Sequence, residues 1–185
     1  VTYDSYGFGL ANKAGKEMLP LIHDYIGTPE DGIAIYQQKE KQGYMDKTGK
    51  KLTPAKYANA WKFKGGIAAV SVYDKVKAED KWGFIDKTGR EIIPLKYIRV
   101  CGYKEGIAVV EREEKKYFTV NKMAKETPLN YDKLGFQYYD RILVQSGGKY
   151  GIINSKGEEV IPLKYDHAWD VSTWQRTGHL SGVRL

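Results

Sequence analysis

The sequence contains a single cysteine, Cys101, among 185 residues. One cysteine cannot form an intramolecular disulfide, so a disulfide-stapled scaffold is excluded. No apolar run approaches the roughly 18 residues of a membrane-spanning helix, and we expect no membrane insertion. The histidines His23, His167 and His179 stand far apart, without the spacing of a metal-ligand set or a catalytic pair. We therefore expect no metal site, no cofactor and no enzymatic activity.

Tyrosine is the dominant aromatic residue, with 15 copies against 5 Phe and 4 Trp. It suits half-buried, pleated surfaces, where the ring packs and the hydroxyl stays hydrated, so the composition favours β structure. The formal net charge of +7 could attract an anionic partner. Many lysines fall in predicted turns, however, so we expect a solvated basic surface and no nucleic-acid partner. The carboxylates of Glu111, Glu113 and Glu114 alternate with basic residues, which predicts a solvated turn rather than an acid–base pair.

An internal repeat is the strongest pattern in the sequence. The stretches KWGFIDKTGREIIPLKY (81–97) and KYGIINSKGEEVIPLKY (149–165) share it, as do QGYMDKTGKKLTPAKY (42–57) and FGLANKAGKEMLPLIH (8–23). In each copy a glycine precedes a proline by 11 residues, and the pairs are Gly9 and Pro20, Gly43 and Pro54, Gly83 and Pro94, and Gly151 and Pro162. A fifth, degenerate copy ends at Pro128, with Phe118 in place of the first glycine and Ala124 in place of the second. Such regularity indicates a tandem array of small supersecondary units.

Each copy predicts a β-hairpin. The segment Lys87-Thr88-Gly89 has the composition of a three-residue turn that ends on a left-handed glycine. The equivalent turn glycines are Gly15, Gly49, Gly89 and Gly157. Pro94 is expected to end the second strand, because proline cannot donate to the ladder, and residues 95–97 to lead into a loop. A third strand follows, and the glycines at its start are Gly32, Gly66 and Gly106.

The predicted fold is all-β, a tandem array of about five three-stranded antiparallel units. Phe84 and Ile85 are both apolar on neighbouring, oppositely facing positions, so the strand should be covered on both faces by adjacent units. We expect an open, solenoid-like array, and a closed barrel or propeller-like arrangement is the alternative. A single array covers residues 6–170 and a non-matching tail covers 172–185. The unit boundaries fall at about 6–36, 42–73, 81–112, 115–145 and 149–171.

These motifs resemble the WG-repeat family, also called KWG repeats, of mostly bacterial proteins. The shared stretch is K-W/Y-G-F/I-I-D-x-x-G-x-x-x-I-P-x-x-Y followed by E-G-x-A-x-V, which residues 81–110 match almost throughout. The resemblance implies β-rich arrays, often in larger or exported proteins, with no catalytic residues and no settled ligand. An exported location is therefore slightly favoured over the cytoplasm. Because the sequence starts at Val1, we expect either a removed leader or a trimmed chain.

Aromatic residues at non-repeating positions are the best ligand candidates, since recurrent aromatics indicate packing between units. The candidates are Trp61, Tyr73, Trp169 and Trp174. Tyr73 lies in an insertion, roughly residues 71–80, and insertions in repeat arrays often lie on the binding side. Cys101 aligns with Trp61 and is expected to be a packed residue. The favoured function is a non-catalytic protein–protein interaction scaffold, and a carbohydrate or cell-wall binding module is the alternative.

Overall fold

The computed structural model describes residues 7–11, 14–15 and 17–168. Antiparallel strands form nearly all of its regular structure, and one 3-10 turn, Glu113–Lys115, interrupts them. Among the described residues, no helix has the length and apolarity needed to cross a membrane. The chain divides into two compact units, residues 1–95 and residues 96–185. Each unit is described by itself below.

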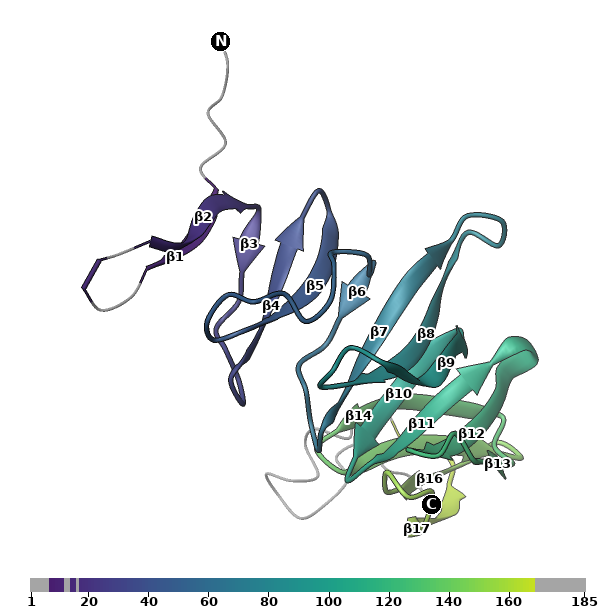
Figure 1. Cartoon of the computed structure of the whole chain (residues 1–185). Coiled ribbons are helices and arrows are strands. Elements are labelled where there is room, and N and C mark those ends of the chain that lie inside the picture. Colours follow the sequence, from purple (N-terminus) through teal and green to yellow (C-terminus); the bar gives the residue numbers. More distant parts are fainter. Residues whose placement is uncertain (1–6, 12–13, 16, 169–185) are drawn as a thin grey trace. The chain divides into compact units, whose positions relative to one another are not determined.

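Residues 1–95 contain three small sheets that follow one another along the chain (Figure 1). The first pairs β1 (Phe8–Ala11) with β2 (Glu17–His23). The second has the order β3 (Tyr25–Ile26), β4 (Ile33–Gln38), β5 (Lys41–Asp46). The third has the order β6 (Asn59–Ala60), β7 (Ile67–Asp74), β8 (Glu79–Asp86), β9 (Glu91–Tyr97). The boundary between the two units falls inside β9.

Residues 96–185 contain two four-stranded sheets. The first has the order β10 (Arg99–Lys104), β11 (Ile107–Arg112), β12 (Lys116–Asn121), β13 (Glu126–Leu129). The second has the order β14 (Lys133–Tyr138), β15 (Arg141–Ser146), β16 (Lys149–Ile153), β17 (Glu159–Tyr165). In every sheet, neighbours in the chain are neighbours in space. Each sheet is thus an open meander with an edge strand on both sides, and the all-β tandem array is confirmed.

The repeat contains one strand more than the three that the sequence pattern indicates. The additional strands are β3, β6, β10 and β14, which follow the proline segments and pair with the next strand in the chain. Their sequences have no common motif: β6 is Asn-Ala and β10 is Arg-Val-Cys-Gly-Tyr-Lys. They become strands because a neighbouring strand offers them a ladder. Local sequence therefore could not reveal them.

Proline does not end the second strand of the hairpin, contrary to the sequence prediction. Pro94 lies inside β9, and Pro162 lies inside β17. Both strands are at the edge of their sheets, where a residue without an N–H costs the ladder little. The edge position of the strand was not visible in the sequence, and this is why the prediction was wrong.

The hairpin turns share one set of hydrogen bonds. In the turn after β8, the amide of Gly89 donates to the Asp86 carbonyl, while Asp86 Oδ1 accepts from the amides of Thr88 and Arg90. The same three bonds recur in the turns that begin at Asp46, Asn121 and Asn154. The turn glycines have φ values from 76° to 88°, and they are Gly15, Gly49, Gly89 and Gly157. Glycine adopts this left-handed conformation readily because it has no Cβ to clash with the backbone.

The glycines Gly32, Gly66 and Gly106 have the same left-handed conformation, with φ between 75° and 84°. Each immediately precedes a strand, and so ends the turn that leads into β4, β7 or β11. These turns reverse the chain between the first and second strands of three of the sheets. Both glycine sets are therefore placed at reversals of the meander.

Apolar side chains gather between consecutive sheets. In residues 1–95, one core cluster joins Tyr44 of the second sheet to Val70 and Ile85 of the third. In residues 96–185, a second cluster joins Val109 to Val144 and similarly spans two sheets. Phe84 and Ile85 are both buried, with exposed fractions of 0% and 1%. A single sheet cannot cover both of its faces, so neighbouring repeats stabilise one another.

Candidate functional site

Two of the aromatic residues that the sequence singled out lie on one face of the third sheet. Asn59 pairs with Ser71, and Ser71 pairs with Trp82, so these three side chains share a face. Tyr73 lies two residues beyond Ser71 and therefore on the same face. The ring of Trp61, which follows β6, lies 5.2 Å from the ring of Trp82. We call Trp61, Trp82 and Tyr73 the aromatic face.

The aromatic face is accessible to solvent. Trp61 is 36% exposed and Tyr73 is 51% exposed, while Trp82 is half-buried. Recurrent aromatic positions were expected to pack between units. The ring of Trp82, in the predicted unit 81–112, does pack against Trp61 of the predicted unit 42–73. Trp82 is thus the member of the face that the sequence argument missed, and a β-register would have been needed to find it.

The inserted segment lengthens a hairpin instead of forming a loop. Strands β7 and β8 remain paired as far as Asp74 and Glu79, and the hairpin extends past β6 and β9 (Figure 1). The tight turn at its tip is held by Asp74 Oδ1, which accepts hydrogen bonds from the amides of Val76 and Lys77. The extension carries Tyr73, so the insertion enlarges the sheet face on which the aromatic residues gather.

Polar groups lie beside the aromatic face. The Asn59 side-chain amide donates to Ser71 Oγ and to Asp80 Oδ2, both at 2.9 Å. Asp80 pairs with Tyr73 across the hairpin and is partly exposed. The face therefore combines flat apolar rings with a carboxylate and an amide that are held in fixed positions. The other two predicted ligand residues, Trp169 and Trp174, lie outside the described residues.

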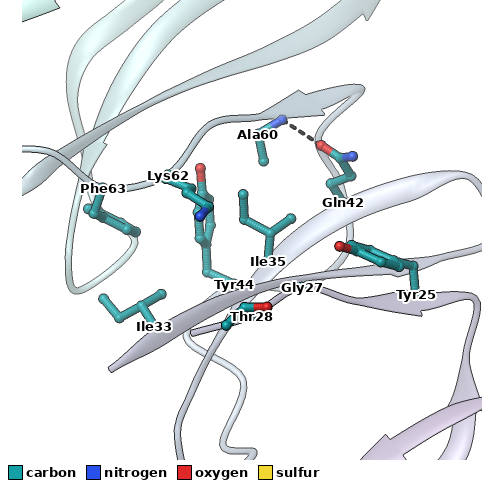
Figure 2. Close-up of a pocket in the computed structure, with 10 residues that line it drawn as sticks. All are labelled: Tyr25, Gly27, Thr28, Ile33, Ile35, Gln42, Tyr44, Ala60, Lys62 and Phe63. Atoms are coloured by element: carbon teal, nitrogen blue, oxygen red, sulfur yellow. Dashed lines mark hydrogen bonds between the residues drawn. The ribbon is translucent and has the colours of Figure 1, made fainter. Parts of the chain in front are cut away.

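A pocket lies on the opposite side of β6, between the second and third sheets (Figure 2). Its volume is about 220 Å³. Polar and apolar side chains share its walls, and its lining residues are Tyr25, Gly27, Thr28, Ile33, Ile35, Gln42, Tyr44, Ala60, Lys62 and Phe63. The Gln42 side chain closes one side of it by accepting a hydrogen bond from the Ala60 amide at 2.6 Å. Sequence reasoning did not find this pocket, because it depends on how two sheets pack.

The lone cysteine and several acidic groups serve the packing of residues 96–185. Cys101 is 2% exposed, and burial raises the pKa of its thiol to about 11, which keeps the thiol protonated at neutral pH. The charge pattern predicted that Glu111 lies in a solvated turn, and this was wrong. Glu111 is buried and forms an ion pair with Arg99 at 2.8 Å. The register of β10 against β11 places the two opposite each other, which the sequence could not show.

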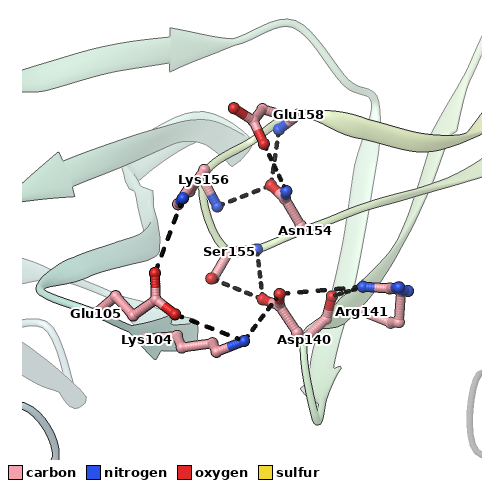
Figure 3. Close-up of polar contacts among 8 residues, drawn as sticks. All are labelled: Lys104, Glu105, Asp140, Arg141, Asn154, Ser155, Lys156 and Glu158. Atoms are coloured by element: carbon pink, nitrogen blue, oxygen red, sulfur yellow. Dashed lines mark hydrogen bonds and ion pairs between the residues drawn. The ribbon is translucent and has the colours of Figure 1, made fainter.

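Three hairpin turns in residues 96–185 are joined by a polar network (Figure 3). Asp140 Oδ1 accepts hydrogen bonds from the Ser155 amide and hydroxyl, and Asp140 Oδ2 pairs with Lys104 at 3.1 Å. Glu105 and Lys156 add a longer contact at 3.8 Å. Burial would raise the pKa of Asp140, but these hydrogen bonds and the lysine charge outweigh it and lower the pKa. The network fixes turns, and Asp140 is held as an ion.

The described residues contain no group of three or more His, Cys, Asp or Glu arranged to hold a metal ion. A family model described as "WG containing repeat" matches four stretches of the chain, residues 8–41, 43–75, 82–117 and 150–172, which together make up more than half of it. The unmatched stretch between the last two contains the degenerate copy with Phe118 and Ala124. No sequence among the curated proteins matches the chain.

Proposed function

The chain belongs to the WG-repeat family, a β-repeat module, and on this basis we propose that it is a non-catalytic scaffold that binds another protein. The observation that carries the proposal is the aromatic face. Aromatic side chains are enriched at the centres of protein interfaces, where a few of them supply most of the binding free energy. Trp61 and Tyr73 offer large rings with few rotatable bonds, so little conformational entropy is lost when a partner covers them.

The roles of the acidic residues support the non-catalytic part of the proposal. Asp46 and Asp86 accept hydrogen bonds from turn amides, and Glu126 accepts one from the Tyr97 hydroxyl at 2.6 Å. Lys96 and Arg112 also contact Glu126, at 2.8 and 3.0 Å. Carboxylates engaged in this way stabilise turns and sheets, and a general base needs a free lone pair directed at a substrate.

The test begins with cross-linking of the full chain in its source cells, followed by purification of the cross-linked protein. Trp61→Ala and Tyr73→Ala should each raise the Kd for that purified protein at least tenfold, since interface centres lose the most when truncated. Met123→Ala is the matched control, because Met123 is 83% exposed in a turn of the other unit and should leave the Kd unchanged. Equal binding by all three variants would remove the aromatic face from the proposal.

A carbohydrate is the second candidate ligand, and the position of Asp80 and Asn59 favours it. A sugar ring could lie on Trp61 or Tyr73 while its hydroxyl groups donate to the Asp80 carboxylate. Binding to a glycan array, quenching of tryptophan fluorescence by the same glycan, and loss of both in Asp80→Asn would support this candidate. A partner protein that binds equally well to Asp80→Asn and Asp80 forms would favour the scaffold.

A further inference from the structure

The pocket in Figure 2 has an occupied counterpart in the other unit. Strand register identifies the equivalent residues. Ala60 is the second residue of the β6–β7 ladder and pairs with Val70, and Leu134 is the second residue of the β14–β15 ladder and pairs with Val144. Ala60 and Leu134 thus hold the same place in two sheets. The same comparison makes Gly27 equivalent to Cys101, since each follows a paired residue, Ile26 or Val100, by one position.

The counterpart is filled by the chain's own side chains. Leu134 and Cys101 are 4% and 2% exposed and belong to one core cluster, together with Tyr117. Tyr117 pairs with Glu111, and Gln42 pairs with Gln37, which makes Gln42 the equivalent of Tyr117. Three positions therefore carry smaller or more polar side chains at the pocket than at its counterpart. The pocket exists because Gly27, Ala60 and Gln42 leave space that larger residues occupy elsewhere in the array.

The filled counterpart shows what chemistry fits this space. There, a leucine and a thiol occupy the equivalent positions between two sheets. At the pocket, Ile33, Ile35 and Phe63 supply an apolar part of the wall, and polar groups such as the Gln42 side chain supply the rest. Lys62 at the rim is paired with Glu30 at 2.9 Å, so an ion pair already meets its charge. A volume of about 220 Å³ lies below the roughly 300–1,000 Å³ of small-molecule sites and suits one side chain.

We infer that the pocket receives a leucine-like aliphatic side chain from an extended segment of a partner protein. The extended form follows from the position of the pocket beside β3, the edge strand of the second sheet. Tyr25, Gly27 and Thr28 line the pocket from that edge. A partner strand that lies along an open edge gains main-chain hydrogen bonds, and pockets beside the edge select its side chains. This inference rests on the proposed scaffold function and specifies a second contact for the partner.

The direct test uses N-acetyl-leucine methylamide as the probe and N-acetyl-glycine methylamide as its control. Isoleucine methyl signals of the full chain are followed by NMR, with Ile33 and Ile35 reporting on the pocket and Ile152 and Ile153 on the buried core of the other unit. The leucine probe should shift the first pair in a saturable manner and leave the second pair unmoved. The glycine probe should shift neither.

Variants that fill the pocket provide the decisive comparison. Ala60→Leu copies Leu134 and should abolish the shifts while keeping or raising the Tm, because the leucine occupies existing space. Gly27→Cys copies Cys101 and should weaken them; a Cβ at Gly27 would lie no closer than 3.4 Å to a neighbouring atom, so it fits. Ala11→Leu adds the same side chain at an exposed position of β1 and is the matched control.

Shifts that are lost in Ala60→Leu and retained in Ala11→Leu support the inference. Shifts that persist in Ala60→Leu, an absence of shifts in the parent chain, or larger shifts with N-acetylglucosamine than with the leucine probe would overturn it. The outcome is separable from that of the scaffold proposal. A partner protein that binds Ala60→Leu as tightly as the parent leaves the scaffold standing and removes the pocket contact, whereas the absence of any protein partner removes the scaffold and with it the partner side chain proposed for the pocket.

Discussion

Phe118 lies directly opposite Pro128 in the ladder of β12 and β13, which runs without a register shift. At the equivalent place in β16 the residue is Gly151, and the ladder to β17 shifts register around it. A Cβ on Gly151 would lie 2.7 Å from the Ile161 carbonyl oxygen, which the bulged partner strand brings close. The degenerate copy has one residue fewer before its proline, so it lacks the bulge and accommodates Phe118. The glycine and the bulge therefore depend on each other.

Replacement of Gly83, the equivalent of Gly151 in the repeat, should be costly even by alanine. A Cβ at Gly83 would lie 2.5 Å from the Ile93 carbonyl oxygen and 2.8 Å from the Leu95 amide nitrogen, and both are backbone atoms. We expect Gly83→Ala to lower the free energy of unfolding by about 1–3 kcal/mol, as overpacking does in other cores. Urea denaturation measures it. A loss below about 0.5 kcal/mol would show that β9 can move away from β8.

The turn in the degenerate copy should be improved by glycine. The Ala124 amide donates to the Asn121 carbonyl, as in the glycine-containing turns, and Ala124 has a φ of 58°. A residue with a Cβ pays about 1–2 kcal/mol for the left-handed conformation, so Ala124→Gly should stabilise the chain by about 1 kcal/mol. Gly89→Ala should do the opposite, because it adds the same strain and a Cβ 2.6 Å from Thr53 Cγ2. Thermal unfolding of both variants tests the pair.

The contact between Trp61 and Trp82 should appear as an energetic coupling. Their ring centroids are 5.2 Å apart with planes inclined by 60°, within the range of favourable aromatic pairs. Such pairs contribute about 0.5–1.5 kcal/mol beyond burial of their area. A double-mutant cycle with Trp61→Ala and Trp82→Ala should return a coupling of that size. Additive losses would indicate that each ring contacts other groups more than its partner.

Acid should destabilise the chain through His23. The side chain is 1% exposed, packs edge-on against Tyr36 at 5.1 Å, and neither ring nitrogen has a hydrogen-bond partner among the described residues. Burial is the main cause that lowers the pKa of His23, and the charge of Lys51 lowers it further, while Asp24 acts in the opposite direction. The folded state thus binds the proton more weakly than the unfolded state.

This difference fixes the pH range of the effect. The contribution of His23 to stability is fully present above its unfolded pKa, near 6.5, and decreases as the pH falls from there through the lowered folded pKa. One proton limits the slope to about 1.4 kcal/mol per pH unit. His23→Phe keeps a ring beside Tyr36 and should flatten the urea-measured stability between pH 7 and 5. An unchanged slope in this variant would assign the pH dependence to other groups.

The repeats and their turns were predictable because their chemistry is local. Asp86 and Gly89 lie three residues apart, and the hydrogen bonds that join their backbone and side-chain groups form within that short segment. An acidic or amide residue followed at a fixed distance by glycine therefore indicates the turn wherever it occurs. The alternation of Phe84 and Ile85 likewise indicates a strand buried on both faces, since side-chain direction alternates within a single strand.

The additional strands and the sites were decided by contacts between distant residues. β10 has no recurrent motif and becomes a strand only because β11 pairs with it. Trp61 meets Trp82 across a separation of 21 residues, and the pocket requires Ala60 to face Ile33 and Ile35 of an earlier sheet. The repeat in the sequence determined the local hairpins. Which side chains fill the space between two sheets, and which leave it open, was determined only by the packing of one sheet on the next. The reason is that two strands far apart in the sequence bring their residues to the same place.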